Sequence, residues 1–332
     1  MSKSFNVVGV GNALVDILSH VEDQFLAEHG VEKGIMTLID TDRAVELYSH
    51  MGPAVEISGG SAANTIAAIA ALGGKTAYVG KVKDEQLGRI FQHDMRAQGA
   101  AYDTPLASAG DGHETGRCMV LVSPDGERSM NTYLGWSEFL APADIVEAEM
   151  ADAEWIYLEG YRFDGPDSHA AFQKAITATK SAGGKVSVTL SDPFCVARHR
   201  AAFRKMVRED VDLLFANEHE LKSLYETEDL ETAIATARAE CETVACTVGA
   251  KGAHLVQNDL RVHAPTEATA VVDATGAGDL FAAGVLAGLC RGADLLTAGR
   301  RGCVAAAEII GHIGARPEAD LKALMAEKGL MG

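Results

Sequence analysis

Short apolar runs alternate with longer amphipathic stretches along most of this chain, and this alternation limits the folds that it can adopt. The runs at 5–10, 76–80 and 155–158 have the length and composition of buried strands, and stretches with helical spacing follow at 85–98 and 168–182. Further strand-like runs lie at 185–190, 211–215 and 243–248. Repeated strand–helix units with short connections favour a mostly parallel sheet covered by helices on both faces. We therefore predict an α/β fold with one main domain.

Two segments break this alternation and are predicted to form a separate small sheet. Residues 118–122 and 128–133 flank Pro124-Asp-Gly126, a composition typical of a β-hairpin with a short turn. We expect segments 14–45 and 106–138 to form a small β lid. Residues 1–13, 46–105 and 139–332 would then form the core. The alternative role of the small sheet is a dimer interface, so both a monomer and a homodimer are compatible with the sequence.

The charge balance restricts the partners of the protein. The chain has 29 lysines and arginines against 47 aspartates and glutamates, giving a formal net charge of −18. Such a surface repels nucleic acid and anionic lipid, so we expect neither nucleic acid nor a membrane as a partner. The six cysteines show no zinc-site spacing, and most lie in apolar runs, as buried thiols do in a reducing compartment. With no leader-like start and no membrane-spanning apolar run, the sequence predicts a soluble cytoplasmic protein.

The stretch Asp273-Ala-Thr-Gly-Ala-Gly-Asp279 precedes an apolar run at 280–290 that is expected to be a buried helix. Small residues at 276–278 allow a tight turn and leave backbone N–H groups uncovered at the helix N-terminus. That end carries partial positive charge and free donors, which suit an anion such as phosphate. Asp279 is then placed to take a proton from a hydroxyl group that attacks the phosphate. Helix capping by Asp279 is the commoner explanation when the motif is considered alone.

Other polar or glycine positions follow predicted strands or open predicted helices. Ligands of open parallel sheets bind beyond the carboxyl ends of the strands, whereas unrelated caps and turns would occupy both edges. The candidates therefore indicate a single site at this edge. They are Asp16, Gly59, Gly60, Asn64, Glu159, Asn217, Glu220, Gly249 to Gly252 and Asp279.

Four motifs in this order make the chain similar to the PfkB or ribokinase-like family of sugar and nucleoside kinases. They are Gly11-Asn-Ala-Leu-Val-Asp16, Gly59-Gly-Ser-Ala-Ala-Asn64, Asn217-Glu-His-Glu220 and the 273–279 stretch, which is the most specific. The resemblance spans residues 9–317. Tyr157-Leu-Glu-Gly-Tyr161 and Gly311-His-Ile-Gly-Ala-Arg-Pro317 resemble the adenosine-kinase-like bacterial branch. Ala274 departs from the usual Thr, which should not affect an anion hole built from backbone.

The resemblance implies a ribokinase-like fold and an ATP-dependent phosphotransferase whose core binds nucleotide and substrate. Gly276, Ala277 and Gly278 would form the anion hole, and Asp279 would be the general base. Asp16 would bind two hydroxyl groups of the acceptor. The same pocket would be lined by Gly59, Gly60, Asn64 and Glu159.

For the nucleotide end, the resemblance implies ATP, Mg²⁺ and a monovalent cation such as K⁺ as cofactors. Asn217 and Glu220 would organise Mg²⁺ through water, and Asp273 and Thr275 match part of the family's monovalent-cation site. The loop that holds the nucleotide would consist of Thr247, Gly249, Lys251 and Gly252, and Cys303 and Ala306 would lie against the adenine.

The acceptor is left open between two chemical classes. A nucleoside needs an apolar slot for its base, and the side chains available for it are Ile35, Met36, Leu38, Tyr133, Tyr161 and Phe163. A sugar acid needs a cation, which Arg117 or Arg162 could provide. We expect phosphorylation of a primary hydroxyl of adenosine or a related nucleoside, ahead of a free sugar such as ribose or fructose or an acid such as 2-keto-3-deoxygluconate. A non-catalytic ligand-binding protein is a third possibility, against which the intact Asp279 counts.

Overall fold

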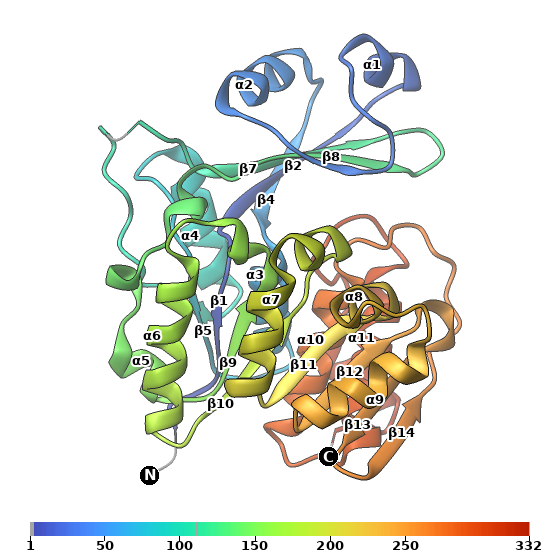
Figure 1. Ribbon diagram of the computed structural model, residues 1–332. Coiled ribbons are helices and arrows are strands. Elements are labelled where there is room, and N and C mark those ends of the chain that lie inside the picture. The colour runs from blue at the N-terminus through green and yellow to red at the C-terminus, as the bar shows by residue number, and fades with distance from the viewer. Residues whose placement is uncertain (1–2, 111, 332) are drawn as a thin grey trace.

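The structure is a computed structural model that describes residues 3–110 and 112–331, and a nine-stranded sheet forms its centre (Figure 1). The strand order is β14-β13-β12-β11-β10-β9-β1-β5-β6, and every pair from β6 to β12 is parallel. Strands β13 and β14 extend the sheet in antiparallel fashion. The strands are β1 (Phe5–Val10), β5 (Thr76–Val79), β6 (Ala100–Ala101), β9 (Ala153–Glu159), β10 (Lys185–Thr189), β11 (Leu213–Asn217), β12 (Thr243–Thr247), β13 (Ala253–Gln257) and β14 (Leu260–Ala264).

Helices cover both faces of this sheet because its central strands are apolar on both sides. On β1, Val7 belongs to one hydrophobic cluster, whereas Val8 and Val10 belong to the other. The first face carries α3 (Ser61–Ala71), α4 (Gln86–Ala97), α10 (Ala277–Leu289), α11 (Leu295–Ile309) and α12 (Leu321–Glu327). The second carries α5 (Glu147–Ala151), α6 (Ser168–Ser181), α7 (Pro193–Glu209), α8 (Glu218–Tyr225) and α9 (Leu230–Glu240). The predicted α/β architecture is confirmed.

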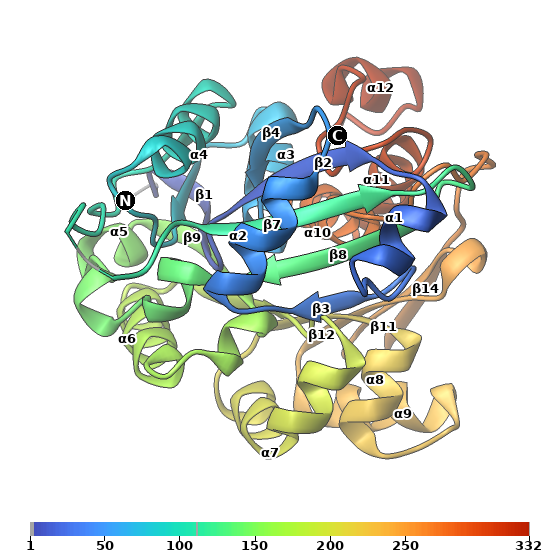
Figure 2. The ribbon, with the colours of Figure 1, turned by 90° about the horizontal axis from the view of Figure 1, so that it is seen from above.

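A second sheet of five strands lies above the carboxyl edge of the first (Figure 1). Its order is β3 (Met36–Leu38), β8 (Arg128–Tyr133), β7 (Gly116–Val122), β2 (Leu14–His20) and β4 (Val55–Gly59). Helices α1 (Asp23–Glu28) and α2 (Thr41–His50) lie over its outer face, as the view from above shows (Figure 2). Leu26 and Leu47 from these helices pack against Met119, Leu121 and Tyr133 of the sheet. The predicted small sheet is therefore present, with its outer face covered by its own helices.

The small sheet takes in more of the chain than the lid segments we expected. Strand β4 pairs with β2 although it lies within 46–105, which we assigned to the core. Strand β2 was not expected at all, and Asp16 lies in its middle instead of following the strand at 5–10. Within the expected lid segment 14–45, β3 contributes only three residues, all exposed. Because β2 alternates buried and partly exposed residues, its sequence lacks the continuous apolar run that marks the core strands.

Among the described residues, no helix combines the length and the apolar character needed to cross a membrane. All six cysteines lie in the described ranges and are free thiols, five of them buried.

Candidate active site

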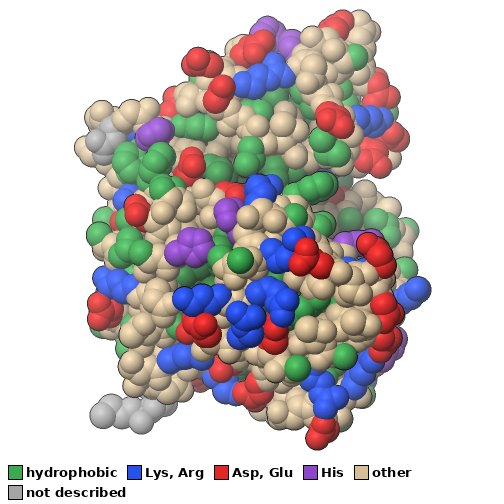
Figure 3. Space-filling view, viewed as in Figure 1, with side chains coloured by type: hydrophobic (Ala, Val, Ile, Leu, Met, Phe, Trp, Pro, Cys, Tyr) green, Lys and Arg blue, Asp and Glu red, His purple; other side chains and the backbone are tan. Residues whose placement is uncertain are grey.

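A cavity of about 960 Å³ separates the carboxyl edge of the large sheet from the small sheet. Residues at the ends of four core strands line it: Glu159 of β9, Thr189 of β10, Asn217 of β11 and Thr247 of β12. The opposite wall includes residues of β2, β3, β7 and β8. The space-filling view shows a groove between the small-sheet part at the top and the larger body (Figure 3). The parallel strands thus bring the candidates Glu159, Asn217 and Thr247 to one edge, as expected for this architecture.

Helix α10 starts at the cavity wall and carries Asp279 in its first turn. Gly276 is its N-cap and has a φ of 78°, a left-handed conformation that glycine adopts without strain. Gly276, Ala277 and Gly278 all line the cavity, so the N–H groups of the first turn lie beside it. The helix dipole and these donors make this end suited to an anion.

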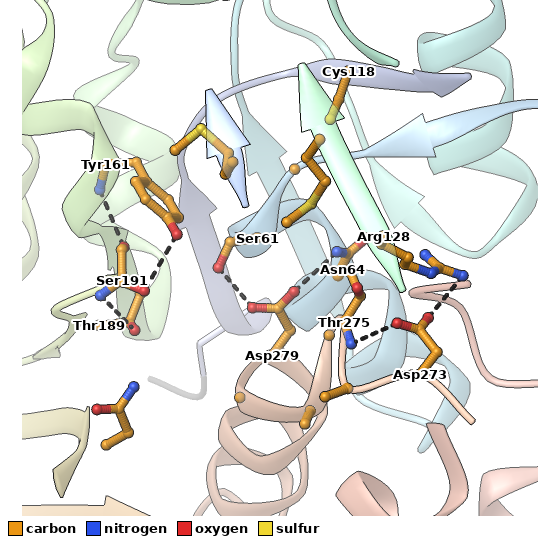
Figure 4. Close-up of a pocket in the computed structure, with 18 of the residues that line it drawn as sticks. Ser61, Asn64, Cys118, Arg128, Tyr161, Thr189, Ser191, Asp273, Thr275 and Asp279 are labelled. Carbon is orange, nitrogen blue, oxygen red and sulfur yellow. Dashed lines mark hydrogen bonds and ion pairs between the residues drawn. The ribbon is translucent and has the colours of Figure 1, made fainter. Parts of the chain in front are cut away.

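The Asp279 carboxylate is held by two donors from α3 (Figure 4). Ser61 Oγ donates to Oδ1 at 2.6 Å, and Asn64 Nδ2 donates to Oδ2 at 2.9 Å. Burial raises the pKa of Asp279, while the hydrogen bonds from Ser61 and Asn64 and the charge of Arg316 lower it. The carboxylate is thus oriented by neutral donors that an incoming hydroxyl group can replace.

Asp16 faces the cavity from the small sheet, opposite Asp279. Burial raises its pKa to about 6, and Arg316 and Arg128 oppose the rise. Gly59 does not line the cavity, but a Cβ there would lie 2.3 Å from Cγ of Asp16. A side chain at position 59 would therefore displace this carboxylate.

Glu159 closes the floor of the same region and is 1% exposed. Its Oε2 accepts a hydrogen bond from the N–H of Ala62 at 2.9 Å, which ties the end of β9 to the start of α3. Burial raises the pKa of Glu159 to about 7, against the hydrogen bonds from the N–H groups of Ala62 and Asn12. Direct contact of Glu159 with an acceptor remains a prediction.

Asn217 and Glu220 form a reciprocal cap at the start of α8. Asn217 Oδ1 accepts from the N–H of Glu220 at 2.9 Å, and Glu220 Oε2 accepts from the N–H of Asn217 at 2.9 Å. Burial raises the pKa of Glu220 to about 7. The described residues contain no cluster of three or more His, Cys, Asp or Glu side chains that could cage a metal ion. Both residues line the cavity, which fits Mg²⁺ held mainly by phosphate oxygens and water.

Of the positions expected around the nucleotide, Thr247 and Gly249 line this cavity. Lys251, Gly252, Cys303 and Ala306 are described residues that do not line it. A Cβ at Gly252 would lie 2.1 Å from the carbonyl oxygen of Ala264, so this glycine allows the close approach of strand β14. The nucleotide-binding role of these four residues remains a prediction.

Asp273 is paired with an arginine that the sequence analysis did not single out. Arg128 of β8 lies with Nη2 2.8 Å from Asp273 Oδ2, and the two side chains are 6% and 3% exposed (Figure 4). Asp273 also accepts from the N–H of Thr275 at 3.0 Å and from that of Gly314 at 3.1 Å. This carboxylate thus already has two N–H donors and a cationic side chain. The monovalent-cation role of Asp273 and Thr275 remains a prediction.

Comparison with known proteins agrees with this geometry. The family model described as "pfkB family carbohydrate kinase" matches residues 34–321. The chain belongs to the PfkB family.

Solved structures of this family superpose over nearly the whole chain. A probable sugar kinase from Rhizobium etli CFN 42 is 45% identical with a TM-score of 0.93, covering 99% of both chains. The adenosine kinase from Sinorhizobium meliloti is 44% identical with a TM-score of 0.92, covering 98% of this chain and 99% of that one. Among sequence relatives, an uncharacterized sugar kinase from Archaeoglobus fulgidus is 29% identical over 74% of this chain and 95% of its own length. The protein is accordingly a kinase of sugars or nucleosides with the ribokinase-like fold.

The two arginines that could have bound a sugar acid, Arg117 and Arg162, do not line the cavity. Arg162 is 1% exposed and does not line the cavity; its guanidinium donates to the carbonyl oxygen of Leu140 and to Ser168 Oγ. Arg117 also lies outside the cavity wall and pairs with Glu114 at 2.8 Å. Neither of the two arginines proposed for a sugar acid reaches the site, because each is occupied by its own local partners.

The expected apolar slot is present in part. Met36, Leu38 and Tyr161 line the cavity, joined by Met130 and Leu134. Ile35, Tyr133 and Phe163 do not line it. Phe163 instead packs in the core, with its ring centroid 4.1 Å from that of Phe203. Tyr133 lies in the cluster under α1 and α2.

Two functional candidates were missed by sequence reasoning, namely Arg128 and Arg316. Arg128 lies in the predicted hairpin and Arg316 in the 311–317 motif, but neither segment by itself indicates a function for the arginine. Their charge alone did not distinguish them from the surface arginines, because their partners are distant in sequence.

Proposed function

We propose that this kinase transfers the γ-phosphate of ATP to a primary hydroxyl of a ribose-containing acceptor, adenosine or a related nucleoside. The observation that carries the proposal is the composition of the acceptor half of the cavity. The Asp16 carboxylate lies in the same cavity as an apolar set of lining residues, namely Met36, Leu38, Cys118, Met130, Leu134 and Tyr161. Among the described lining residues, the one arginine is Arg128, which is paired with Asp273.

This composition favours a nucleoside over a sugar acid for simple physical reasons. An apolar wall without a free cation stabilises a flat uncharged base, while burying a ligand carboxylate there would cost several kcal/mol, roughly. The Asp16 carboxylate can accept hydrogen bonds from two ribose hydroxyl groups. The likeness to the adenosine kinase from Sinorhizobium meliloti supports the same class.

The chain's own groups account for the transfer in the following way. Asp16 and the apolar wall hold the acceptor so that its primary hydroxyl lies near Asp279. As the hydroxyl oxygen bonds to the γ-phosphorus, the bond from that phosphorus to the β–γ bridging oxygen breaks and ADP leaves. Asp279 takes the hydroxyl proton in this step, a contribution of roughly 10²–10⁴-fold. The N–H groups at the start of α10 stabilise the negative charge on the transferred group. Mg²⁺, when bound near Asn217 and Glu220, would neutralise charge on the phosphates.

The test is a panel of acceptors assayed for ATP-dependent phosphorylation: adenosine, 2′-deoxyadenosine, inosine, guanosine, ribose, fructose and 2-keto-3-deoxygluconate. We expect the highest kcat/KM for a ribonucleoside, with a loss of about 10-fold or more for the 2′-deoxy analogue. Tyr161→Ala should lower kcat/KM for adenosine far more than for ribose. Phe163→Ala, which alters the core and not the cavity, is the matched control. A free sugar or a sugar acid as the best substrate would sink the nucleoside proposal.

A further inference from the structure

Arg316 lies behind the cavity wall, at the junction between the small sheet and the core. It follows α11, yet it contacts segments more than 200 residues earlier in the chain. Its Nη2 donates to the carbonyl oxygen and to Oγ of Ser58, both at 3.0 Å. Its Nη1 donates to the carbonyl oxygen of Ala63 at 2.9 Å. Ser58 belongs to β4 of the small sheet and Ala63 to the first turn of α3, so one guanidinium fastens both elements.

The neighbours of this junction make it a mechanical link to the site. Gly59 and Gly60 connect Ser58 to α3, and Gly59 packs against the Asp16 carboxylate. The first turn of α3 then supplies Ser61 and Asn64, which hold Asp279. Displacement of this junction would therefore move the partners of both carboxylates.

Arg316 is also a positive charge that lowers the pKa of both Asp16 and Asp279. Its field acts on Asp16 and Asp279, while its N–H groups are bonded to the carbonyl and hydroxyl oxygens of the junction. Among the described residues, no carboxylate forms an ion pair with it. The carboxylate oxygens thus remain available to the acceptor. Burial lowers the pKa of Arg316 to about 10, which leaves it charged at neutral pH.

We propose that Arg316 is a positioning residue for phosphotransfer, which fixes the lid–core junction and balances the charges of Asp16 and Asp279 without occupying their oxygens. The inference rests on the proposed function for the roles of those two carboxylates. It assigns Arg316 no contact with substrate, because Arg316 does not line the cavity.

Several like charges surround Asp279, which is why this balance matters. Ser61 and Asn64 of α3 donate to it, and Arg316 acts on it as a positive charge. The other titratable groups whose charges interact with it are Asp16 on β2, Tyr157 and Glu159 on β9, Tyr161, and Glu220 on α8. Arg128 acts on Asp16 from β8. Without Arg316, the repulsion among the carboxylates would favour protonated Asp279, so a base would be lost at the lower end of the working pH range.

The experiment compares Arg316→Gln and Arg316→Lys with wild type, using the best acceptor of the panel. Arg301→Gln is the control for loss of a buried guanidinium, because Arg301 donates to the Leu330 carbonyl oxygen and does not line the cavity. In Arg316→Gln we expect kcat/KM to fall by about 10-fold or more at pH 7. We also expect the acidic limb of the plot of kcat/KM against pH to move to higher pH. Arg316→Lys should keep the limb but raise KM, since it keeps the charge and loses the multiple hydrogen bonds. The proposal is overturned if the acidic limb of the pH profile is unchanged in Arg316→Gln, or if it shifts equally in Arg301→Gln.

A second readout does not depend on activity. Burial raises the folded-state pKa values of Asp16 and Asp279, and the charge of Arg316 opposes this rise. The guanidinium therefore stabilises the folded protein at pH values where these groups ionise. The melting temperature of Arg316→Gln should thus fall further below wild type as pH rises from about 5 to 8. The difference in melting temperature between Arg301→Gln and wild type should stay constant over the same pH range. If no acceptor in the panel is phosphorylated, the proposed function fails, and this measurement still decides Arg316: a deficit independent of pH overturns its electrostatic role.

Discussion

A carboxylate that serves as a base must be ionised at the working pH and still hold a proton once it has accepted one. At Asp279, burial raises the pKa, and Ser61, Asn64 and Arg316 lower it. The net pKa is raised, and the two hydrogen bonds and the guanidinium limit the rise. Its hydrogen bonds also fix its rotamer toward the cavity, so orientation costs nothing when the acceptor arrives.

Asp279→Asn should keep the fold and nucleotide binding but lower turnover by roughly 10²-fold or more, because the amide cannot accept the hydroxyl proton. Single-turnover kinetics with adenosine measure the chemical step, and calorimetry with ATP checks binding. Ser61→Ala is the matched control, since it removes one donor to the carboxylate and leaves the base in place. Near-wild-type chemistry in Asp279→Asn would remove this residue from the role.

At the scale of elements, the β7–β8 hairpin is joined to the loop that precedes α10, where we propose that phosphate binds. The buried pair of Arg128 and Asp273 forms one contact. The hairpin turn forms another, where a Cβ at Gly126 would lie 3.7 Å from the carbonyl oxygen of Val272. Such contacts would hold a lid over the phosphate groups and exclude water from the reaction.

Arg128→Met should loosen the lid and raise the ratio of ATP hydrolysed to acceptor phosphorylated, because water then reaches the γ-phosphate. Arg117→Met is the matched control, as Arg117 lies in the same hairpin but pairs with Glu114 outside the cavity. Parallel assays of ADP and of phosphorylated acceptor give the ratio. Equal ratios in the two variants would show that the ion pair does not govern water exclusion.

At the scale of the whole molecule, the acidic chain concentrates several buried carboxylates at one site. Burial raises the pKa of Asp16 to about 6 and those of Glu159 and Glu220 to about 7. A pKa raised above its unfolded value favours the folded state at low pH and loses that contribution as pH rises through the folded pKa. The active site is therefore a source of instability at neutral pH, which cationic ligands would relieve.

Glu220→Gln should accordingly gain stability relative to wild type as pH rises from about 4.5 to 7, by up to about 3 kcal/mol. The neutral amide avoids the cost of ionising a buried group. Urea unfolding at a series of pH values measures the difference. Glu32→Gln, at an exposed position outside the cavity, is the control for removal of a surface carboxylate. A flat profile for Glu220→Gln would mean that Glu220 is already solvated in the folded state.

Most of the architecture could be predicted from the sequence, because it depends on local patterns. Continuous apolar runs of strand length identify strands buried on both faces, and such strands form a parallel sheet between helices. The motif at 273–279 places small residues before an apolar helix, which is itself the physical requirement for an anion site. The shared edge of Glu159 and Asn217 follows from strand direction alone, because they end the parallel strands β9 and β11.

The tertiary structure decided which side chains face the cavity and which are used elsewhere. Arg162 and Phe163 stand next to Tyr161 in sequence, yet Tyr161 lines the cavity, while Arg162 binds carbonyl oxygens and Phe163 packs in the core. The partners of Arg316 at Ser58 and Ala63 lie beyond the range of any local pattern. A side chain's pKa and exposure depend on burial and on charges brought near by folding, and these come from segments that only the packed chain places together.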